Sequence, residues 1–280
     1  MRGESFYRFF ALVIVAIFLT LKVIGQENDT LPSKQAEETF DFIILNSKVN
    51  DRFTFLGRDF GRRIPSANID VMYYANTGWF LNASVFKFLE QTVPLQYGIT
   101  AGYQTDLSFK TDMNLSYSQF FIFEDSNITG IQNMGLLQGT FGLDWNYLYS
   151  TLQAQALWNE KPDLFIVSKH SRYFEFDQKL FNVLTVSFEP SISFTFGTNN
   201  FYYLGEFEEY QGVNPETPES VVFLAWNMEI PINFEFKNWT VELQGRLVVP
   251  GNTPDFDAST TRMVFGCQFY YFIPLKRKGA

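Results

Sequence analysis

Alternation of apolar and polar residues is the dominant pattern of the chain, and it is clearest between Phe223 and Pro250, "FLAWNMEIPINFEFKNWTVELQGRLVVP". A period of two is typical of β-strands, whose successive side chains point to opposite faces of the sheet. The pattern restarts after Lys237-Asn238, so we expect two strands joined by a tight turn. The apolar positions are Leu224, Trp226, Met228, Ile230, Ile232, Phe234 and Phe236, then Trp239, Val241, Leu243, Leu247 and Val249.

The first of these strands is long for a soluble sheet, where strands usually have about 5–6 residues. A strand that crosses a bilayer at a tilt needs roughly 9–11 residues, with apolar side chains toward lipid and polar ones toward the lumen. We therefore predict that the face from Leu224 to Phe236 is turned toward lipid.

Similar alternation recurs along the chain and predicts about 12 strands. Long and short connections alternate along the chain, and the long ones come after the odd-numbered strands. Transmembrane barrels have this arrangement, with short periplasmic turns and long extracellular loops. The predicted fold class is thus all-β, an antiparallel transmembrane β-barrel. The other expected strands are the weak segment from Arg52 to Leu56, then Ala67 to Tyr73, Trp79 to Val85, Tyr97 to Phe109, Met113 to Tyr117, Phe141 to Tyr147, Leu152 to Ala156, an ambiguous stretch from Phe165 to Phe176, Leu184 to Phe196, and Met263 to Tyr271.

The N-terminus indicates export. Arg2 and Arg8 precede an apolar run that Lys22 ends, and Gly25 follows. This is typical of a signal peptide, whereas an uncleaved anchor would want ~20 apolar residues. We expect a signal peptide in residues 1–25, a periplasmic lead in 26–50 with an apolar patch from Phe40 to Leu45, the barrel in 51–273, and a periplasmic tail in 274–280.

Composition agrees with a membrane protein. Aromatic residues make up 19% of the chain, including 33 Phe and 14 Tyr, and charged residues 18%, below the roughly 25% of soluble domains. The net charge of −9 argues against nucleic acid as a partner. The single cysteine, Cys267, falls on the apolar parity between Phe265 and Phe269 and is expected to act as a small hydrophobic residue.

The last predicted strand carries a more specific signal. Gly266, Phe269 and Tyr271 match the glycine-x-x-aromatic-x-aromatic pattern of the C-terminal assembly signal of Gram-negative outer-membrane β-barrels. The chain resembles that porin-like class from about Arg52 to Ile273. The resemblance implies location in the cell outer membrane, with outer-membrane lipid, lipopolysaccharide and the barrel assembly machinery as partners.

Charged residues on the polar parity of the last strands are the main candidate site. If they form salt bridges, they would fill the lumen, because an unpaired charge in a low dielectric is costly. If they do not, they would form a constriction that selects small polar solutes by charge. These lumen candidates are Glu189, Glu229, Glu242, Arg246 and Arg262.

The sequence gives little support for a catalytic site or a metal site. The only histidine, His170, lies in "SKHSRYF", and a hydrolase would need it beside a nucleophile. In the known outer-membrane phospholipase a serine follows the histidine by two residues, whereas Arg172 stands there in this chain. We expect His170 to be a strand residue near the outer interface, and we expect no enzyme, no cofactor and no metal site, since zinc sites want several His or Cys.

Two loops are candidates for binding. One holds aromatic residues followed by acidic residues, which could bind a partner or a calcium ion or could simply be solvated. In "GRDFGRR", Arg58, Arg62 and Arg63 could hold lipopolysaccharide or be plain loop residues. The first loop's candidates are Phe201, Tyr202, Tyr203, Glu206, Glu208 and Glu209.

Three functions are compatible with the sequence. The first is a narrow, porin-like channel for small polar solutes. The second is a non-conducting barrel that binds a partner protein or ligand through its extracellular loops. The third, supported only by His170, is a lipid hydrolase.

Overall fold

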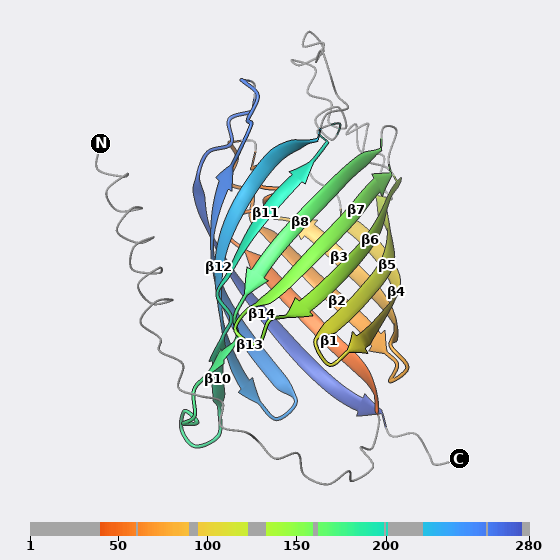
Figure 1. The fold of residues 1–280 in the computed structure, drawn as a ribbon, viewed down its shortest axis with the longest axis vertical. Coiled ribbons are helices and arrows are strands. Elements are labelled where there is room, and N and C mark those ends of the chain that lie inside the picture. The colour runs from red at the N-terminus through yellow and green to blue at the C-terminus, as the bar shows by residue number, and fades with distance from the viewer. Residues whose placement is uncertain are drawn as a thin grey trace, which may run out of the picture. The chain divides into compact units, whose positions relative to one another are not determined.

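A computed structural model describes residues 40–59, 61–89, 95–122, 133–158, 162–198, 200, 221–255 and 257–275. The predicted signal peptide and most of the predicted lead and tail lie outside these residues. The described chain forms one antiparallel sheet (Figure 1). Its strands are β1 (Asp41–Asn50), β2 (Ser66–Tyr74), β3 (Trp79–Phe88), β4 (Gln96–Ser108), β5 (Thr111–Ile122), β6 (Asn133–Asp144), β7 (Tyr149–Trp158), β8 (Asp163–Ser171), β9 (Phe174–Glu175), β10 (Thr185–Phe188), β11 (Ser191–Gly197), β12 (Val222–Phe236), β13 (Trp239–Pro250) and β14 (Arg262–Leu275).

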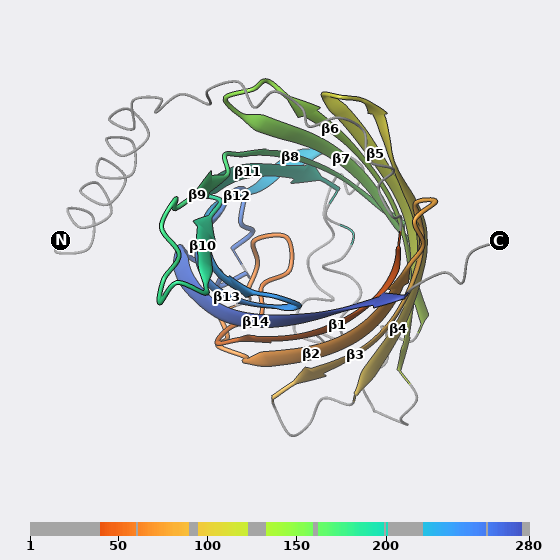
Figure 2. The same ribbon diagram turned by 90° about the horizontal axis from the view of Figure 1, so that it is seen from below.

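The sheet closes on itself. Neighbouring strands pair in chain order from β1 to β8, β1 also pairs with β14, and β11 joins β8 to β12. From Thr185 to Thr195, strands β10 and β11 pair with β12 in one register, so they act as a single wall strand interrupted at Glu189-Pro190. The two-residue β9 pairs only with β10 and adds no strand to the wall. The result is a closed barrel of 12 strands, seen end-on in Figure 2. The predicted fold class is confirmed. Among the described residues, no helix is long and apolar enough to cross a membrane.

The first strand begins earlier than predicted. Strand β1 pairs with β14 from Asp41↔Leu275 to Asn50↔Gly266, so the barrel starts at Asp41 and the predicted boundary at residue 51 is wrong. The expected strand from Arg52 to Leu56 lies instead in the loop between β1 and β2. Phe42 and Ile44 hid the alternation, because they follow the inward parity of Asn46 and Lys48 although they are apolar.

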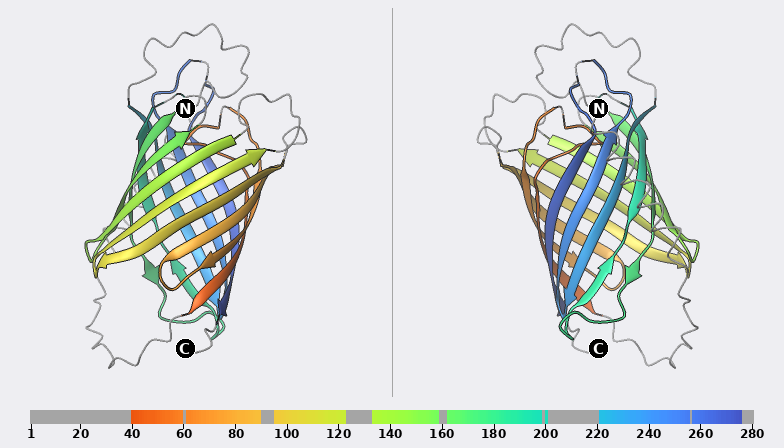
Figure 3. Two further views of the ribbon diagram at one scale, coloured as in Figure 1. Left: turned by 90° about the vertical axis from the view of Figure 1, so that its right-hand side faces the viewer. Right: turned by 90° about the vertical axis from the view of Figure 1, so that its left-hand side faces the viewer.

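The two ends of the barrel differ in their connections. Tight turns join β2 to β3, β4 to β5, β6 to β7, and β12 to β13, whereas longer segments follow β1, β3, β5, β11 and β13. We call these the short-turn end and the long-loop end; Figure 3 shows the tilted strands between them. In the first tight turn, Gly78 has φ +93°, and a Cβ there would lie 2.1 Å from the Gln104 carbonyl oxygen, so glycine is required. The register of Asp41 with Leu275 places both at the short-turn end.

The outer face of the barrel is apolar. Ile99, Leu115 and Leu152 are each at least half exposed, at 52%, 50% and 55%, although they lie within strands. Exposed aromatic residues lie at the short-turn end, where amphipathic rings suit a membrane interface. They are Tyr73, Trp79, Trp145 and Tyr147. An apolar exterior around a closed barrel is the arrangement that a bilayer requires.

For one residue of the predicted lipid-facing row, Leu224, the predicted face is wrong. Leu224 is fully buried and belongs to an interior cluster with Leu157 and Phe165. The register between β11 and β12 shifts between Thr195 and Phe196, as at a β-bulge, and this shift breaks the parity. Beyond the bulge, Phe223 pairs with the exposed Phe196 on the outer face, and the regular outward row of β12 begins at Trp226.

Candidate functional site: a polar lumen under an inward-folded loop

The loop between β1 and β2 folds into the barrel at the long-loop end. We call this loop, residues 51–59 and 61–65, the cap. The Phe53 ring packs edge-on against Phe88 of β3, with centroids 4.8 Å apart, and Phe55 packs against Phe165 of β8 at 6.4 Å. Strands β3 and β8 lie on nearly opposite sides of the ring. The cap therefore crosses the bore, as the orange loop inside the ring in Figure 2 shows.

A dry apolar layer lies where the cap meets the wall. Leu157, Phe165 and Leu224 are at most 2% exposed. Gly57 allows this close approach: its φ is +84°, and an added Cβ would lie 2.2 Å from the Ala225 Cβ. The side chains packed on the layer are Phe55, Leu56, Met134, Leu136 and Val222.

A buried arginine ties the cap to the loop between β13 and β14. Arg58 is fully buried, and its Nε lies 3.4 Å from Asp257 Oδ2. Its guanidinium also donates to the Gly251 carbonyl oxygen. A buried charge is tolerable only when it is paired and hydrogen-bonded, so these contacts hold the cap in place. The suggestion that Arg58 holds lipopolysaccharide is wrong for this structure, because solvent does not reach its side chain.

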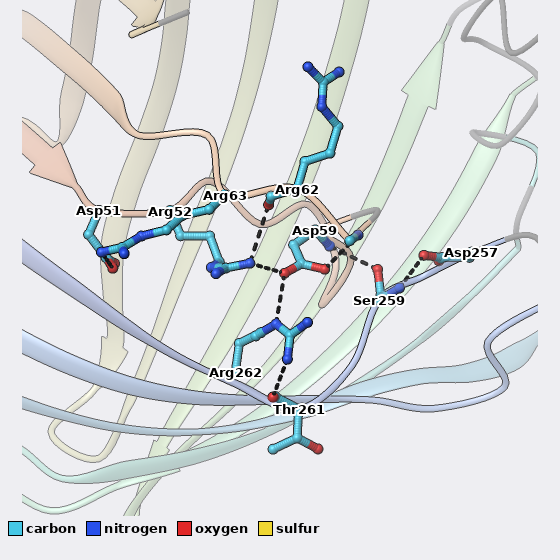
Figure 4. Close-up of polar contacts among 10 residues, drawn as sticks. Asp51, Arg52, Asp59, Arg62, Arg63, Asp257, Ser259, Thr261 and Arg262 are labelled. Atoms are coloured by element: carbon cyan, nitrogen blue, oxygen red, sulfur yellow. Dashed lines mark hydrogen bonds and ion pairs between the residues drawn. The ribbon is translucent and has the colours of Figure 1, made fainter.

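A second group of charges surrounds Asp59 (Figure 4). Arg52 donates to its carboxylate, and Arg262 Nε lies 3.4 Å from the same oxygen. The Asp59 backbone N–H donates to Ser259 Oγ at 3.0 Å. Arg262, expected as a charge of the lumen, is thus bound to the cap.

Charged side chains from neighbouring strands share the wall below the cap. Glu229 of β12 lies opposite Arg246 of β13 in the register. Glu242 lies opposite Gln268, which in turn lies opposite Lys48. Glu229 accepts a hydrogen bond from Gln244, and Arg246 Nη2 donates to Thr54 Oγ1 of the cap at 3.1 Å.

These wall charges do not form salt bridges within the described residues. There, every ion pair within 4.0 Å includes a residue of the cap, and none includes Lys48, Glu229, Glu242 or Arg246. All four side chains keep partial exposure to solvent. The structure thus shows no salt-bridge network filling this part of the lumen, and the role of these charges in selecting solutes stays a prediction.

Glu189 and Lys48 complete the charged wall. Glu189 sits at the interruption between β10 and β11, where its N–H donates to the Pro231 carbonyl oxygen at 3.4 Å. Lys48 was missed by sequence reasoning because its strand was assigned to the N-terminal lead. The alternation at the end of this strand could have revealed it. Asn46, Lys48 and Asn50 fall on one face, and Leu45, Ser47 and Val49 fall on the other.

Amide and hydroxyl groups line the wall formed by β4 to β7. Thr100 and Ser118 hydroxyls lie 2.7 Å apart. Gln155 donates to the Gln138 side-chain oxygen at 3.3 Å, linking β7 to β6. This wall therefore presents mainly hydrogen-bonding groups, with Asp106 and Asp112 near the short-turn end, whereas the wall of β1, β12 and β13 carries charges of both signs.

The remaining predicted residues fall elsewhere. The aromatic and acidic loop candidates, Phe201 to Glu209, lie outside the described residues. Phe269 and Tyr271 point outward from β14 with Cys267, while Gly266 has inward parity, and an added Cβ there would lie 2.6 Å from Asn50 Oδ1. Their role in assembly stays a prediction. No group of three or more His, Cys, Asp or Glu in the described ranges could hold a metal ion.

Comparison with known proteins gives the fold. No protein-family model matches the chain, and no curated protein does. An outer membrane channel from Pseudomonas putida F1 is 9% identical with a TM-score of 0.50, covering 90% of this chain and 100% of that one. LpxR from Salmonella typhimurium is 8% identical with a TM-score of 0.50, covering 82% and 100%. The NanC porin is 7% identical with a TM-score of 0.48, covering 81% and 98%.

At these identities the likeness shows the fold alone. The chain has the fold of outer-membrane β-barrels, which agrees with its apolar outer face. The resemblance drawn from the sequence is therefore confirmed at the level of the fold.

Proposed function

We propose that the protein is a porin-like channel for small polar solutes, narrowed by the cap at its long-loop end. The observation that carries this proposal is the partial solvent exposure of the charged side chains on the wall below the cap. Lys48, Glu229 and Glu242 point inside a closed barrel, yet solvent reaches each of them. A packed interior would bury such side chains or pair them.

Arg246 supports selection by charge at this level of the lumen. Its Nη2 donates to Thr54 Oγ1 of the cap at 3.1 Å, and its side chain keeps partial exposure to solvent opposite Glu229. Its positive charge could therefore attract a passing anionic or carbonyl group at this level. Weak, local contacts of this kind let a solute both enter and leave.

The cap favours a second candidate, a non-conducting barrel that binds a partner through its extracellular loops. Contacts of Phe53 and Phe55 with opposite walls would hinder passage. In that case the aromatic and acidic loop around Phe201 would supply the binding surface. Outer-membrane lipid, lipopolysaccharide and the barrel assembly machinery remain proposed partners under both candidates.

Planar-bilayer conductance separates the two. The refolded protein would be measured beside a variant in which residues 53–64 are replaced by a short Gly-Ser linker. A channel predicts discrete steps in the wild type and larger steps in the variant. Silence of both proteins, with the heat-modifiable gel mobility of a folded barrel, would contradict the channel and favour the binding barrel.

A further inference from the structure

The only histidine of the chain lies between two serines on the outer face of the barrel. Ser150 of β7 stands directly opposite His170 of β8, and its Oγ lies 2.8 Å from His170 Nδ1. Ser168, two residues before His170, places its Oγ 3.2 Å from Nε2. Both ring nitrogens are therefore hydrogen-bonded to hydroxyl groups, and all three side chains are half-buried.

A tryptophan gives this chain of hydrogen bonds a direction. The Trp145 indole Nε1 donates to Ser150 Oγ at 3.1 Å, and an indole N–H can only donate. Ser150 keeps its own proton to donate to Nδ1. Nε2 then carries the ring proton and donates it to Ser168. In this arrangement Ser150 is the group whose proton a neutral histidine can accept.

The group faces the lipid rather than the lumen. Ser150, Ser168 and His170 share the outward parity of Leu152 and Ile166, which are 55% and 45% exposed. His170 is the residue before the end of β8, so it lies near the short-turn end, contrary to the expected outer interface. Exposed Trp145 and Tyr147 beside it mark interfacial depth, where water and lipid ester groups meet.

We propose that Ser150 and His170 form an esterase site for acyl esters of membrane phospholipids, with Ser168 as a positioning residue. A serine becomes nucleophilic when an adjacent base is oriented by a third group. In this site Ser168 is the group that orients His170. The site lies outside the lumen, so it is independent of the channel.

The reaction would proceed in two steps. Ser150 Oγ attacks the acyl carbonyl carbon while its proton passes to His170 Nδ1; the ester C–O bond breaks, and the departing alcohol oxygen takes that proton. Water then attacks the acyl-serine with His170 as base. A free fatty acid leaves and the Ser150 hydroxyl is restored.

Sequence reasoning missed this group for a geometric reason. It sought a serine two residues after the histidine and found Arg172. The structure supplies one serine two residues before His170 and another from the neighbouring strand. Only the register of β7 with β8 brings Ser150 to the ring.

The test uses the full refolded protein in mixed micelles of detergent and phosphatidylcholine, with released fatty acid as the readout. We expect hydrolysis by the wild type, background rates for Ser150→Ala, and about a 100-fold or greater loss for His170→Ala, since acid–base groups typically contribute 10²–10⁴-fold. Ser168→Ala should alter the pH profile of the rate, and Ser168→Thr should restore it. Ser47→Ala, a lipid-facing serine of β1, is the matched control.

A fluorophosphonate probe followed by mass spectrometry identifies the nucleophile directly. The proposal predicts labelling at Ser150 that is lost in His170→Ala. Labelling that persists in Ser150→Ala, or wild-type hydrolysis no faster than that of Ser150→Ala, would overturn it. Each variant must first show the heat-modifiable mobility of a folded barrel.

Discussion

Arg58 and Asp257 come from different loops, yet they meet in a fully buried ion pair, with Arg58 Nε 3.4 Å from Asp257 Oδ2. One residue belongs to the cap and the other to the loop between β13 and β14. The contact joins the first and last long loops of the described barrel. Loss of this contact should therefore loosen both loops at the long-loop end.

Removing one partner tests this connection. Arg58→Met removes the cation that Asp257 contacts at 3.4 Å, and breaking a buried pair costs about 3–5 kcal/mol. We expect faster hydrogen exchange of the cap amides and larger conductance steps. The double variant Arg58→Met/Asp257→Leu should recover part of the protection, because apolar replacement of a buried pair is often neutral.

Arg63→Met is the matched control for this pair. Arg63 lies 2.9 Å from Asp51, but its side chain is 66% exposed, and exposed pairs contribute about 0–1 kcal/mol. Hydrogen exchange of the cap should barely change. Equal effects of Arg58→Met and Arg63→Met would show that burial does not hold the cap.

A methyl group at Gly57 should also displace the cap. Gly57→Ala would place a Cβ 2.2 Å from the Ala225 Cβ at φ +84°, a conformation that costs non-glycine residues about 1–2 kcal/mol even without a clash. Conductance and cap hydrogen exchange should both rise. Gly245→Ala should leave both unchanged, since nothing lies within 4 Å of a Cβ built there.

Neighbouring residues of β5 test the inside-out arrangement. Leu115 is 50% exposed on the outer face, while Asn114 faces the lumen. Arginine on the lipid face costs up to about 2–4 kcal/mol, with the largest cost at the bilayer centre, so Leu115→Arg should lower the free energy of unfolding measured in liposomes. Asn114→Arg should not. The opposite order would mean that the faces have been assigned the wrong way round.

The strands were predictable where apolar and polar positions alternate strictly, as in β12 and β13. Prediction failed where both parities are apolar: Phe42 and Ile44 made β1 look like a patch in a lead. It also failed at Leu224, because a bulge moves a side chain to the other face without any change in the sequence pattern.

The candidate site was only partly predictable. Glu229, Glu242 and Arg246 follow from parity, since a strand's polar face must be the lumen face once its apolar face meets lipid. The cap does not follow, because Arg58 and Asp257 are far apart in sequence and their pairing depends on the folded loops. The same holds for Ser150 and His170, which only strand register brings together.

If the protein is a channel, solutes pass a charged wall inside the barrel. Reversal potentials in a salt gradient test this passage with wild type, Glu229→Gln and Arg246→Gln. Asp177→Asn, at an exposed turn outside the strands, is the control with the same kind of charge change.

A channel lined by this wall should show opposite shifts: cation preference falls in Glu229→Gln, rises in Arg246→Gln, and stays the same in Asp177→Asn. These shifts follow because each of the first two substitutions removes one fixed charge from the lining. Conducting barrels whose reversal potentials are identical in all four proteins would contradict the assignment of this wall as the lining of the pore.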